Sequence, residues 1–419
     1  MNEYLGNYEP EVNKMMKLKP QIKWFILAVL ILTLAACNGN TTSVDLSLAP
    51  TYAAQTLAAM PTNTMEPVPT STATVVVPTA TATATETPVT ELYPVGPVGF
   101  PENVNPLTGL VVDDPSILDR RPVLIKVANQ PISGRPHAGL SFADMVFEYY
   151  IGSGGNRFIA LFYGQDADMI GPVRSGRMID PYLVSLYEGI LGMEGAYITV
   201  REHIVDILDN RMISSKELCP GLCDDGRMLV TSVFGDSEAL TKIAADRGVV
   251  QQRYLLEGMA FDPEVPEGGK TANIITTQFS TVNPEEWRYD EESGDYLRWT
   301  DNESGEVIDL IPLVDRITDE QLAFSNVVVI FVSHIEHAPT LHDMAIWDNT
   351  FGQRAIAFRD GQAYEITWKT PSRTQPIQLI DDSGETFRLK PGNTWVVVFG
   401  LYSTVDTIAD HWSFTFLMP

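Results

Sequence analysis

The chain has 419 residues, 44% of them hydrophobic and 20% charged, so it is long enough to bury one full core and has room for two. Acidic residues outnumber basic ones by 54 to 28, which gives a formal net charge of −26 at pH 7. This balance argues against nucleic acid as a partner, because phosphate neutralisation needs a basic face. It equally argues against attachment to an anionic bilayer by charge.

The first 37 residues have the organisation of an export signal. Lysines at positions 14, 17, 19 and 23 precede the apolar run WFILAVLILTLAA, which is too short to span a bilayer as a helix. The run ends in LAAC, residues 34–37, which resembles the bacterial lipobox. We therefore expect residues 1–36 to be a lipoprotein signal peptide and Cys37 to carry lipid that holds the protein at the extracytoplasmic face of the cell membrane. The alternative is an ordinary cleaved signal with an incidental cysteine.

Residues 37–103 are predicted to form a disordered tether. They are rich in Thr, Ala, Pro and Val, as in PTSTATVVVPTATATATETP, with little charge and no amphipathic period. Prolines favour stiff extended segments, so we expect the tether to hold the folded part away from the membrane.

Residues 104–262 are predicted to form a mixed α/β domain with helices packed on a sheet. Short runs rich in β-branched and aromatic residues predict strands at 121–129, 144–151 and 157–164. Apolar residues at spacings of three and four predict helices at 180–193, 201–210 and 236–248. In the last of these, Asp236 is the expected N-cap and Gly248 the expected stop.

Residues 263–419 are predicted to form a smaller, mostly antiparallel β domain, which makes the whole chain α+β. Aromatic and β-branched runs within residues 285–301, 354–368 and 377–399 meet in pairs at Ser-Gly, Asp-Gly or Pro-Gly. Such junctions are typical of hairpins.

Several motifs, taken in order, resemble the YerB-type family of bacterial lipoproteins. They are NPLTGL, RPVLIKVAN, GRPHAGLSFADMVFE, NRFIALF and IGPVRSGR in the first half, and WRYDEESGDYLRW, FRDGQAYEITW and LKPGNTWVVV in the second. The resemblance implies a two-domain envelope protein of unknown activity. It also implies that the family keeps positions matching Arg135, Asp144, Glu148, Arg157, Arg174, Ser175 and Arg177. The chain departs from the family pattern at GSGG, residues 152–155, and at GMEGAY, residues 192–197, so no role is expected to centre on them.

Four arginines are candidates for an anion site: Arg135, Arg157, Arg174 and Arg177. They fall at strand ends or in loops of the predicted sheet, where distant side chains converge, and guanidinium groups bind phosphate or carboxylate in bidentate geometry. Asp144, Glu148 and Ser175 would support such a site.

The segment IGPVRSGR leads into the helix predicted from Asp180, whose N-terminus would also favour an anion. In the competing account Asp144, Glu148 or Asp180 pairs with the arginines, which then only lock the sheet to the helix.

Two other groups of residues carry expectations. Cys219 and Cys223 are the two cysteines besides Cys37, and in an oxidising compartment we expect them to form a disulfide, with free thiols or a metal site as alternatives. HIEHAPTLHD holds His334, His337, His342 and Asp343 but lacks the His-Glu-x-x-His order of zinc hydrolases, so we expect a surface loop or hydrogen-bonded histidines, and no metal.

GSGGNR is expected to be a hairpin turn, with an anion-binding backbone nest as the alternative. No cofactor is expected, and no nucleophile-elbow motif is present.

The sequence thus predicts a non-enzymatic, lipid-anchored envelope protein that binds another envelope component, either a polymer or a protein. The alternative is an enzyme acting on an anionic envelope polymer with an arginine-lined phosphate site. Arginines grouped beside an ordered carboxylate base would favour the enzyme, whereas arginines locked individually by acids would favour the binding protein.

Overall fold

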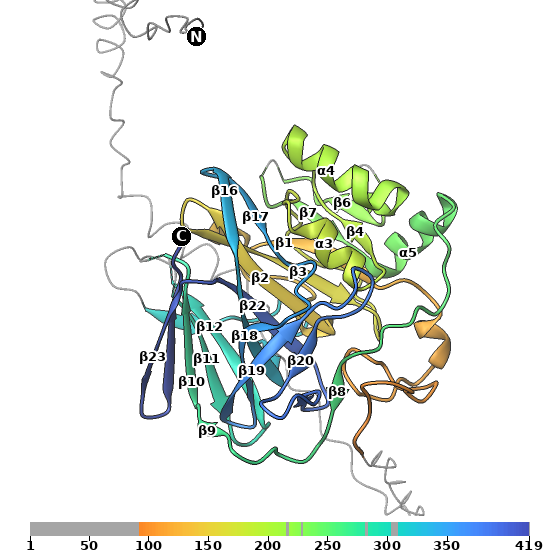
Figure 1. The fold of residues 1–419 in the computed structure, drawn as a ribbon. Helices are drawn as coiled ribbons and strands as arrows, with labels where there is room; N and C mark the ends of the chain where they lie inside the picture. Colours follow the sequence, from red (N-terminus) through yellow and green to blue (C-terminus); the bar gives the residue numbers. More distant parts are fainter. Residues whose placement is uncertain (1–91, 215–217, 228, 281–283, 303–308, 419) are drawn as a thin grey trace, which may run out of the picture. The chain divides into compact units, whose positions relative to one another are not determined.

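Apolar runs from both halves of the chain meet in one large sheet (Figure 1). The computed structural model describes residues 92–214, 218–227, 229–280, 284–302 and 309–418, all within the compact unit Glu86–Pro419. The strands of this main sheet are β1 Val123–Ala128, β2 Met145–Gly152, β3 Gly155–Phe162, β4 Ile190–Gly192, β5 Met212–Ile213, β9 Lys270–Thr271, β15 Asn326–Val332, β18 Gln353–Arg359, β19 Gln362–Lys369, β20 Gln378–Ile380 and β22 Thr394–Gly400. Their order is β20-β19-β18-β15-β22-β2-β3-β1-β4-β5, with β9 beside β19.

Strand β22 joins the two halves. It pairs in parallel with β15 on one side and with β2 on the other, and all seven of its residues are buried, as expected for a strand covered on both faces. The prediction of an antiparallel hairpin at the Pro-Gly junction before β22 was therefore wrong. The hairpins predicted within residues 285–301 and 354–368 are confirmed.

A second sheet packs on one face of the main sheet. Its strands are β10 Ile274–Gln278, β11 Pro284–Asp290, β12 Asp295–Asp301, β13 Leu310–Pro312, β14 Ala323–Phe324, β23 Thr404–Ile408 and β24 His411–Thr415. They follow the order β13-β12-β11-β10-β24-β23, with β14 beside β12. The rings of Trp287 on β11 and Trp395 on β22 lie 5.1 Å apart, so aromatic side chains fill the space between the sheets.

Helices pack on the parts of the main sheet that the second sheet does not cover. They are α3 Asp180–Leu186, α4 Ile198–Leu208 and α5 Ser237–Asp246. Helices α3 and α4 share a core with the face of the main sheet opposite the second sheet, and α5 packs on the same face as the second sheet. The N-cap at Asp236 is confirmed, because its carboxylate accepts the amide of Ala239 at 2.8 Å. Gly248 follows the helix with a φ of 83°, as its predicted stop requires.

The helix predicted at 180–193 ends at Leu186, and its last part forms β4 instead. Gly189 explains the change, because a Cβ at this position would lie 2.4 Å from a methyl group of Leu124. The glycine lets the chain pass close to β1, and the apolar run that follows joins the sheet beside it.

Short elements complete the described residues. They are the 3-10 turns η3 Pro115–Leu118, η4 Ile132–Gly134, η5 Leu140–Phe142 and η6 Asp209–Arg211, and the strand pairs β6 Leu222–Asp224 with β7 Val233–Gly235, β8 Ala260–Phe261 with β21 Arg388–Leu389, and β16 His334–Ala338 with β17 Leu341–Met344. The described body is mostly sheet with few helices.

The folded body includes residues that the sequence assigned to the tether. Val95 is buried and exchanges two backbone hydrogen bonds of 2.9 Å with Phe261. The signal peptide, Cys37 and the tether up to residue 91 lie outside the described residues. Within the described part, none of the helices combines the length and the apolar character that crossing a membrane requires.

Candidate functional site

Three of the four candidate arginines gather at one edge of the main sheet. Strands β1, β2, β4 and β5 run in one direction, and β3 runs against them, so the carboxyl ends of the four strands lie at the same edge as the start of β3. Arg157 on β3 lies opposite Ala128 and Tyr149 in register, close to this edge. In open sheets with helices, the carboxyl ends of parallel strands are the usual position of ligand sites.

Backbone carbonyl groups hold the three guanidinium groups. The Nη1 atoms of Arg157 and Arg177 both donate to the carbonyl of Ser175, at 2.8 and 3.4 Å, and Arg177 also donates to Gly176 at 2.9 Å. Arg174 donates to the carbonyl of Val230 at 2.8 Å. No carboxylate of the described residues forms an ion pair with any of the three guanidinium groups, and their shielded Nε atoms have no hydrogen-bond partner. We call Arg157, Arg174 and Arg177 the arginine group.

Burial and mutual repulsion set the electrostatics of the arginine group. Burial, followed by the charges of Arg177 and Arg174, lowers the pKa of Arg157. Burial likewise lowers the pKa of Arg174 and Arg177, with Glu194 and Asp180 opposing the shift at the two residues respectively. Guanidinium groups start from so high a pKa that all three remain charged at neutral pH. The arrangement therefore concentrates positive charge that no carboxylate in the described part of the chain neutralises by a direct ion pair.

A buried chain of polar contacts lies next to the arginine group. The Tyr149 hydroxyl contacts both Lys126 Nζ and Asp180 Oδ1, and the Lys126 ammonium lies 3.5 Å from the same carboxylate oxygen. The other oxygen of Asp180 accepts the backbone amide of Arg177 at 2.7 Å. Burial lowers the pKa of Lys126 and raises that of Tyr149. Helix α3 has only seven residues, and the carboxylate of Asp180 in its first turn already accepts the Arg177 amide, so the anion site predicted beside this helix depends on the arginine side chains.

Arg135 is not part of the arginine group. Its Nη1 atom forms an ion pair with Asp301 at 2.7 Å, and its Nε donates to the Asn129 side chain at 3.1 Å. Arg135 therefore behaves as the competing account expected, locked by a carboxylate, but the acid comes from the second half of the chain.

The contacts of Arg135 belong to a buried network centred on Arg298 of β12. The Nη2 atom of Arg298 lies 3.0 Å from Glu148 and 2.6 Å from Glu285, and all three side chains are fully buried. The guanidinium carbon lies 4.7 Å from the ring centres of both Trp287 and Trp395. Sequence reasoning missed Arg298, although it lies within the motif WRYDEESGDYLRW.

Glu148 and Tyr149 lie on opposite faces of β2. Both carboxylate oxygens of Glu148 have hydrogen-bond partners within the Arg298 network. Glu148 also accepts the Trp395 indole N–H at 2.8 Å and an N–H of the Asn156 side chain. Burial raises the pKa of Glu148 to about 7, against the lowering effect of Arg298. The structure therefore directs Glu148 toward the second sheet and not toward the arginine group.

Asp144 lies at the opposite end of β2 from the hairpin that leads to Arg157. Its carboxylate accepts the Asn105 side chain at 2.8 Å and the amides of Tyr163 and Gly164 at 2.5 and 3.0 Å. Burial raises its pKa to about 6. Asp144 fixes the end of β3, and the structure does not bring it to the arginine group.

Two further expectations concern local pairing. Cys219 and Cys223 form a disulfide with an S–S distance of 2.05 Å. GSGG forms the turn of the β2–β3 hairpin, with Gly152 paired to Gly155 and positive φ angles at Ser153 and Gly154. Both expectations are confirmed.

The histidine segment forms the β16–β17 hairpin. His334 Nδ1 bonds the carbonyl of Val332 at 2.9 Å, and His342 Nε2 bonds that of Pro339 at 3.1 Å. Within the residues that the structure describes, no three His, Cys, Asp or Glu side chains gather closely enough to hold a metal ion.

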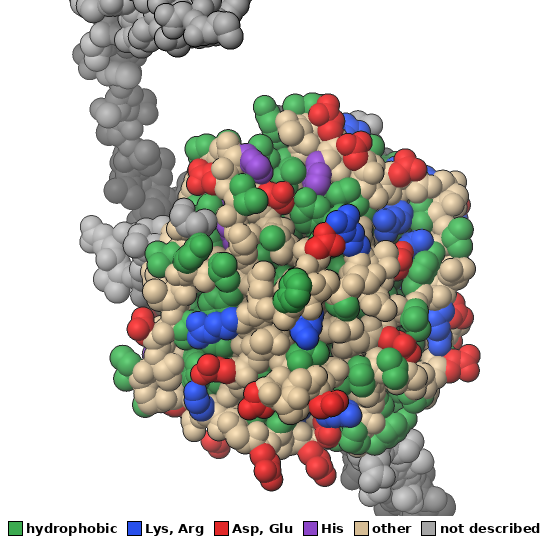
Figure 2. All heavy atoms as spheres, viewed as in Figure 1, with side chains coloured by type: hydrophobic (Ala, Val, Ile, Leu, Met, Phe, Trp, Pro, Cys, Tyr) green, Lys and Arg blue, Asp and Glu red, His purple; other side chains and the backbone are tan. Residues whose placement is uncertain are grey.

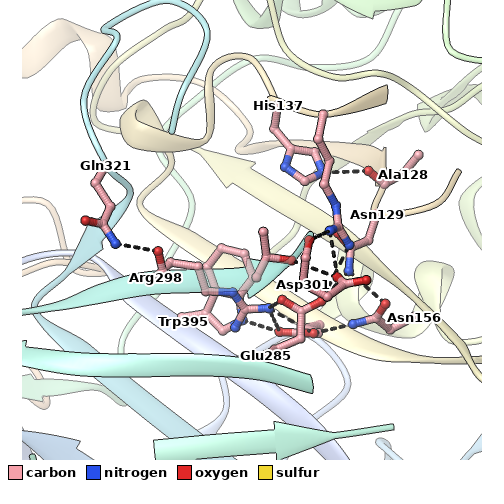
Figure 3. A network of polar contacts seen from close by, with 12 residues as sticks. Ala128, Asn129, His137, Asn156, Glu285, Arg298, Asp301, Gln321 and Trp395 are labelled. Atoms are coloured by element: carbon pink, nitrogen blue, oxygen red, sulfur yellow. Dashed lines mark hydrogen bonds and ion pairs between the residues drawn. The ribbon is translucent and has the colours of Figure 1, made fainter. Parts of the chain in front are cut away.

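His137 is buried beside the Arg298 network, where its Nε2 bonds the carbonyl of Ala128 at 2.8 Å (Figure 3). Burial, followed by the charge of Arg135, lowers its pKa to about 3. The imidazole is therefore neutral in the folded protein at neutral pH.

Comparison with known protein families shows which proteins this chain resembles. Residues 107–249 match the N-terminal domain, and residues 275–396 the C-terminal domain, of the family described as protein of unknown function DUF3048. The chain belongs to the DUF3048 family. YerB, a proposed lipoprotein of Bacillus subtilis, is 25% identical over 302 residues, which cover 70% of this chain and 84% of that protein. The crystal structure of YerB from Bacillus subtilis matches with a TM-score of 0.57 and 24% identity, covering 70% of this chain and 96% of that chain, so the fold is shared.

The two DUF3048 matches do not correspond to two separate sheets. Strands β1 to β5 come from the first match and β15, β18 and β19 from the second, and all of them belong to the main sheet. The Arg298 network likewise joins Glu148 of the first match to Glu285 of the second.

Removing the central cation tests the Arg298 network. Arg298→Met should lower the free energy of unfolding by about 3–5 kcal/mol, because it leaves two carboxylates buried without their partner. Arg288→Met is the matched control on the adjacent strand, where the partly exposed pair with Glu286 should contribute at most about 1 kcal/mol. Urea denaturation measures both, and adding Glu148→Gln and Glu285→Gln to Arg298→Met should recover part of the loss. Equal losses for the two single variants would contradict the central role of Arg298.

The neutral state of His137 predicts a pH dependence. Its folded pKa lies below the ordinary value of 6.5, so its contribution to stability is present above pH 6.5 and is lost as the pH falls toward 3. His137→Gln keeps a side-chain N–H donor and removes the titration. The stability advantage of the unsubstituted protein over this variant should shrink by about 2 kcal/mol between pH 7 and pH 5. Thermal unfolding at both pH values measures it, and a constant difference would show that His137 does not titrate on unfolding.

Proposed function

We propose that this protein is a membrane-anchored binding protein of the cell envelope that recognises an anionic envelope component through the arginine group. The observation that carries the proposal is the gathering of Arg157, Arg174 and Arg177 without an ion pair to a described carboxylate, in a chain whose net charge is −26. Such a concentration of like charge costs folding free energy, and a bound anion offsets that cost.

The contacts of the arginine group favour binding of a phosphate or carboxylate group. The carbonyl of Ser175 holds Arg157 and Arg177 in place, so little side-chain freedom remains to be lost when a ligand binds. The shielded Nε donors have no partner, which is a cost that an acceptor oxygen would remove. Guanidinium groups present two donors side by side to such oxygens.

The alternative of an enzyme acting on an anionic polymer requires a general base that a substrate can reach. Two carboxylates act on the arginine group, Asp180 on Arg177 and Glu194 on Arg174. Asp180 is fully buried, and its oxygens are engaged by Tyr149, Lys126 and the Arg177 amide, which supports a positioning role. Glu194 is partly exposed and is the carboxylate that the enzyme alternative would need as its base, whereas binding needs no base, so we propose binding.

Membrane attachment rests on the sequence of the first 37 residues and on the likeness to the proposed lipoprotein YerB. The export signal assigns the body to the extracytoplasmic face, and the lipid on Cys37 supplies the affinity that a chain this acidic does not gain from anionic headgroups. The component bound is an envelope polymer or an envelope protein that carries phosphate or carboxylate.

The arginine group is tested by thermal unfolding of the full chain with inorganic pyrophosphate and, separately, with citrate. At least one anion should raise the melting temperature of the unsubstituted protein, by an amount equivalent to about 2.7 kcal/mol at a concentration of 100 Kd. Arg157→Gln/Arg177→Gln should abolish this shift. The control Arg288→Gln/Arg354→Gln removes the same charge from one partly exposed and one exposed arginine outside the arginine group, and it should keep the shift. A double variant that melts lower while keeping the full anion shift would show that the arginines only lock the fold.

Lipid attachment is tested by Cys37→Ser in cells that express the full chain. The variant should leave the membrane fraction, because the lipidated cysteine provides the anchor. Fractionation followed by detection of the chain measures it, and unchanged membrane retention would contradict lipidation at Cys37.

A further inference from the structure

A groove lies between the helices and the β16–β17 hairpin. Its volume of about 380 Å³ falls in the range of small-molecule sites. Tyr182 of α3 and His203 of α4 line one side, and Asp343, Trp347 and Arg373 line the other. Figure 2 shows histidine side chains among hydrophobic and acidic ones on this face, over α4 and the hairpin.

The aromatic rings of the groove are fixed against one another. The ring centres of Tyr182 and Trp347 lie 4.6 Å apart, and His203 meets the edge of Tyr182 at 5.2 Å. The Trp347 indole N–H donates to the Tyr182 carbonyl at 3.1 Å, which sets the orientation of the indole. A ligand therefore meets a prearranged aromatic wall.

The Asp343 carboxylate beside this wall keeps unused hydrogen-bonding capacity. Asp343 Oδ1 accepts the Met344 amide at 2.8 Å, but Oδ2 lies 3.5 Å from the Tyr182 hydroxyl, which is long for such a bond. His203 contributes its ring to the wall through the edge contact with Tyr182, because its Nε2 is shielded from solvent and from a ligand in the groove. Burial, followed by the charge of Asp343, raises the pKa of Tyr182 to about 12, so its hydroxyl stays a donor.

Arg373 closes one end of the groove without giving it a net positive charge. It donates to both oxygens of Asp348, at 3.1 and 2.5 Å, and its guanidinium carbon lies 4.7 Å from the centre of the Trp347 ring. Among the residues that line the groove, Asp343 is then the charged group without an ion-pair partner.

We propose that this groove binds a neutral sugar ring, with Tyr182 and Trp347 against its C–H face and with the Asp343 carboxylate bonded to its hydroxyl groups. Sugar hydroxyl groups donate hydrogen bonds, so one ligand can satisfy the carboxylate while its C–H face covers the aromatic rings. Asp343 disfavours an anion by repulsion, and a purely apolar ligand would leave the Asp343 carboxylate covered and unpaired. The groove shares no residue with the arginine group, so the assignment goes beyond the proposed function.

Calorimetric titration of the full chain with a β-linked N-acetylglucosamine trimer and with maltotriose tests the groove. At least one trisaccharide should bind. Trp347→Ala should weaken that binding about tenfold or more, and Asp343→Asn about fivefold. Trp347→Phe keeps an aromatic ring and should stay within about threefold of the unsubstituted protein. Phe351→Ala removes an aromatic side chain that is 98% exposed and does not line the groove, and it should change nothing.

Three results would overturn the assignment. The first is that neither trisaccharide binds. The second is that binding survives in a folded Trp347→Ala variant. The third is that a folded Arg157→Gln/Arg177→Gln variant loses trisaccharide binding. Because the last variant reports on the arginine group, failure of sugar binding is distinguishable from failure of anion binding.

Discussion

The fold depends on one buried cation held between two carboxylates of different segments. Arg298 on β12 contacts Glu285 on the neighbouring strand β11 and Glu148 on β2 of the main sheet. Removing three charged side chains from water costs several kcal/mol each, and their mutual attraction offsets this cost only when the geometry is right. The guanidinium carbon lies 4.7 Å from the ring centres of both Trp287 and Trp395, whose rings meet edge to face, and the indole N–H of Trp395 adds a hydrogen bond to Glu148. The second sheet is thereby fixed on the main sheet in one arrangement.

That arrangement separates the polar residues of β2 by face. Glu148 points toward the second sheet, where its carboxylate pairs with Arg298. Tyr149, its neighbour in sequence, points toward α3 and contacts Asp180. The alternation of side chains along a strand makes the two networks independent. The Arg298 network joins the two parts of the chain. The network of Tyr149 and Asp180 accepts the backbone amide of Arg177.

The candidate arginines illustrate how environment decides the role of a residue type. Arg135 forms an ion pair with Asp301, whereas Arg157, Arg174 and Arg177 donate hydrogen bonds to carbonyl groups and have no ion pair with a described carboxylate. The proposed sugar groove has the opposite character, with an unpaired acid beside aromatic rings. A glycan that carries phosphate or carboxylate would offer both of the proposed chemistries.

The sequence by itself determined the local features of this protein. Strand runs, the β2–β3 hairpin, the Asp236 cap and the Cys219–Cys223 disulfide follow from residues a few positions apart, so pattern and turn chemistry predicted them. The gathering of Arg157 with Arg174 and Arg177 was also foreseeable, because they border the same predicted sheet. Tertiary structure alone decided the insertion of β22 between β15 and β2, the conversion of residues 190–192 into a strand, and the fates of Arg135 and Glu148. Each of these depends on partners 60 to more than 150 residues away, and no local spacing encodes which acid will reach which arginine when sheets from both halves pack together.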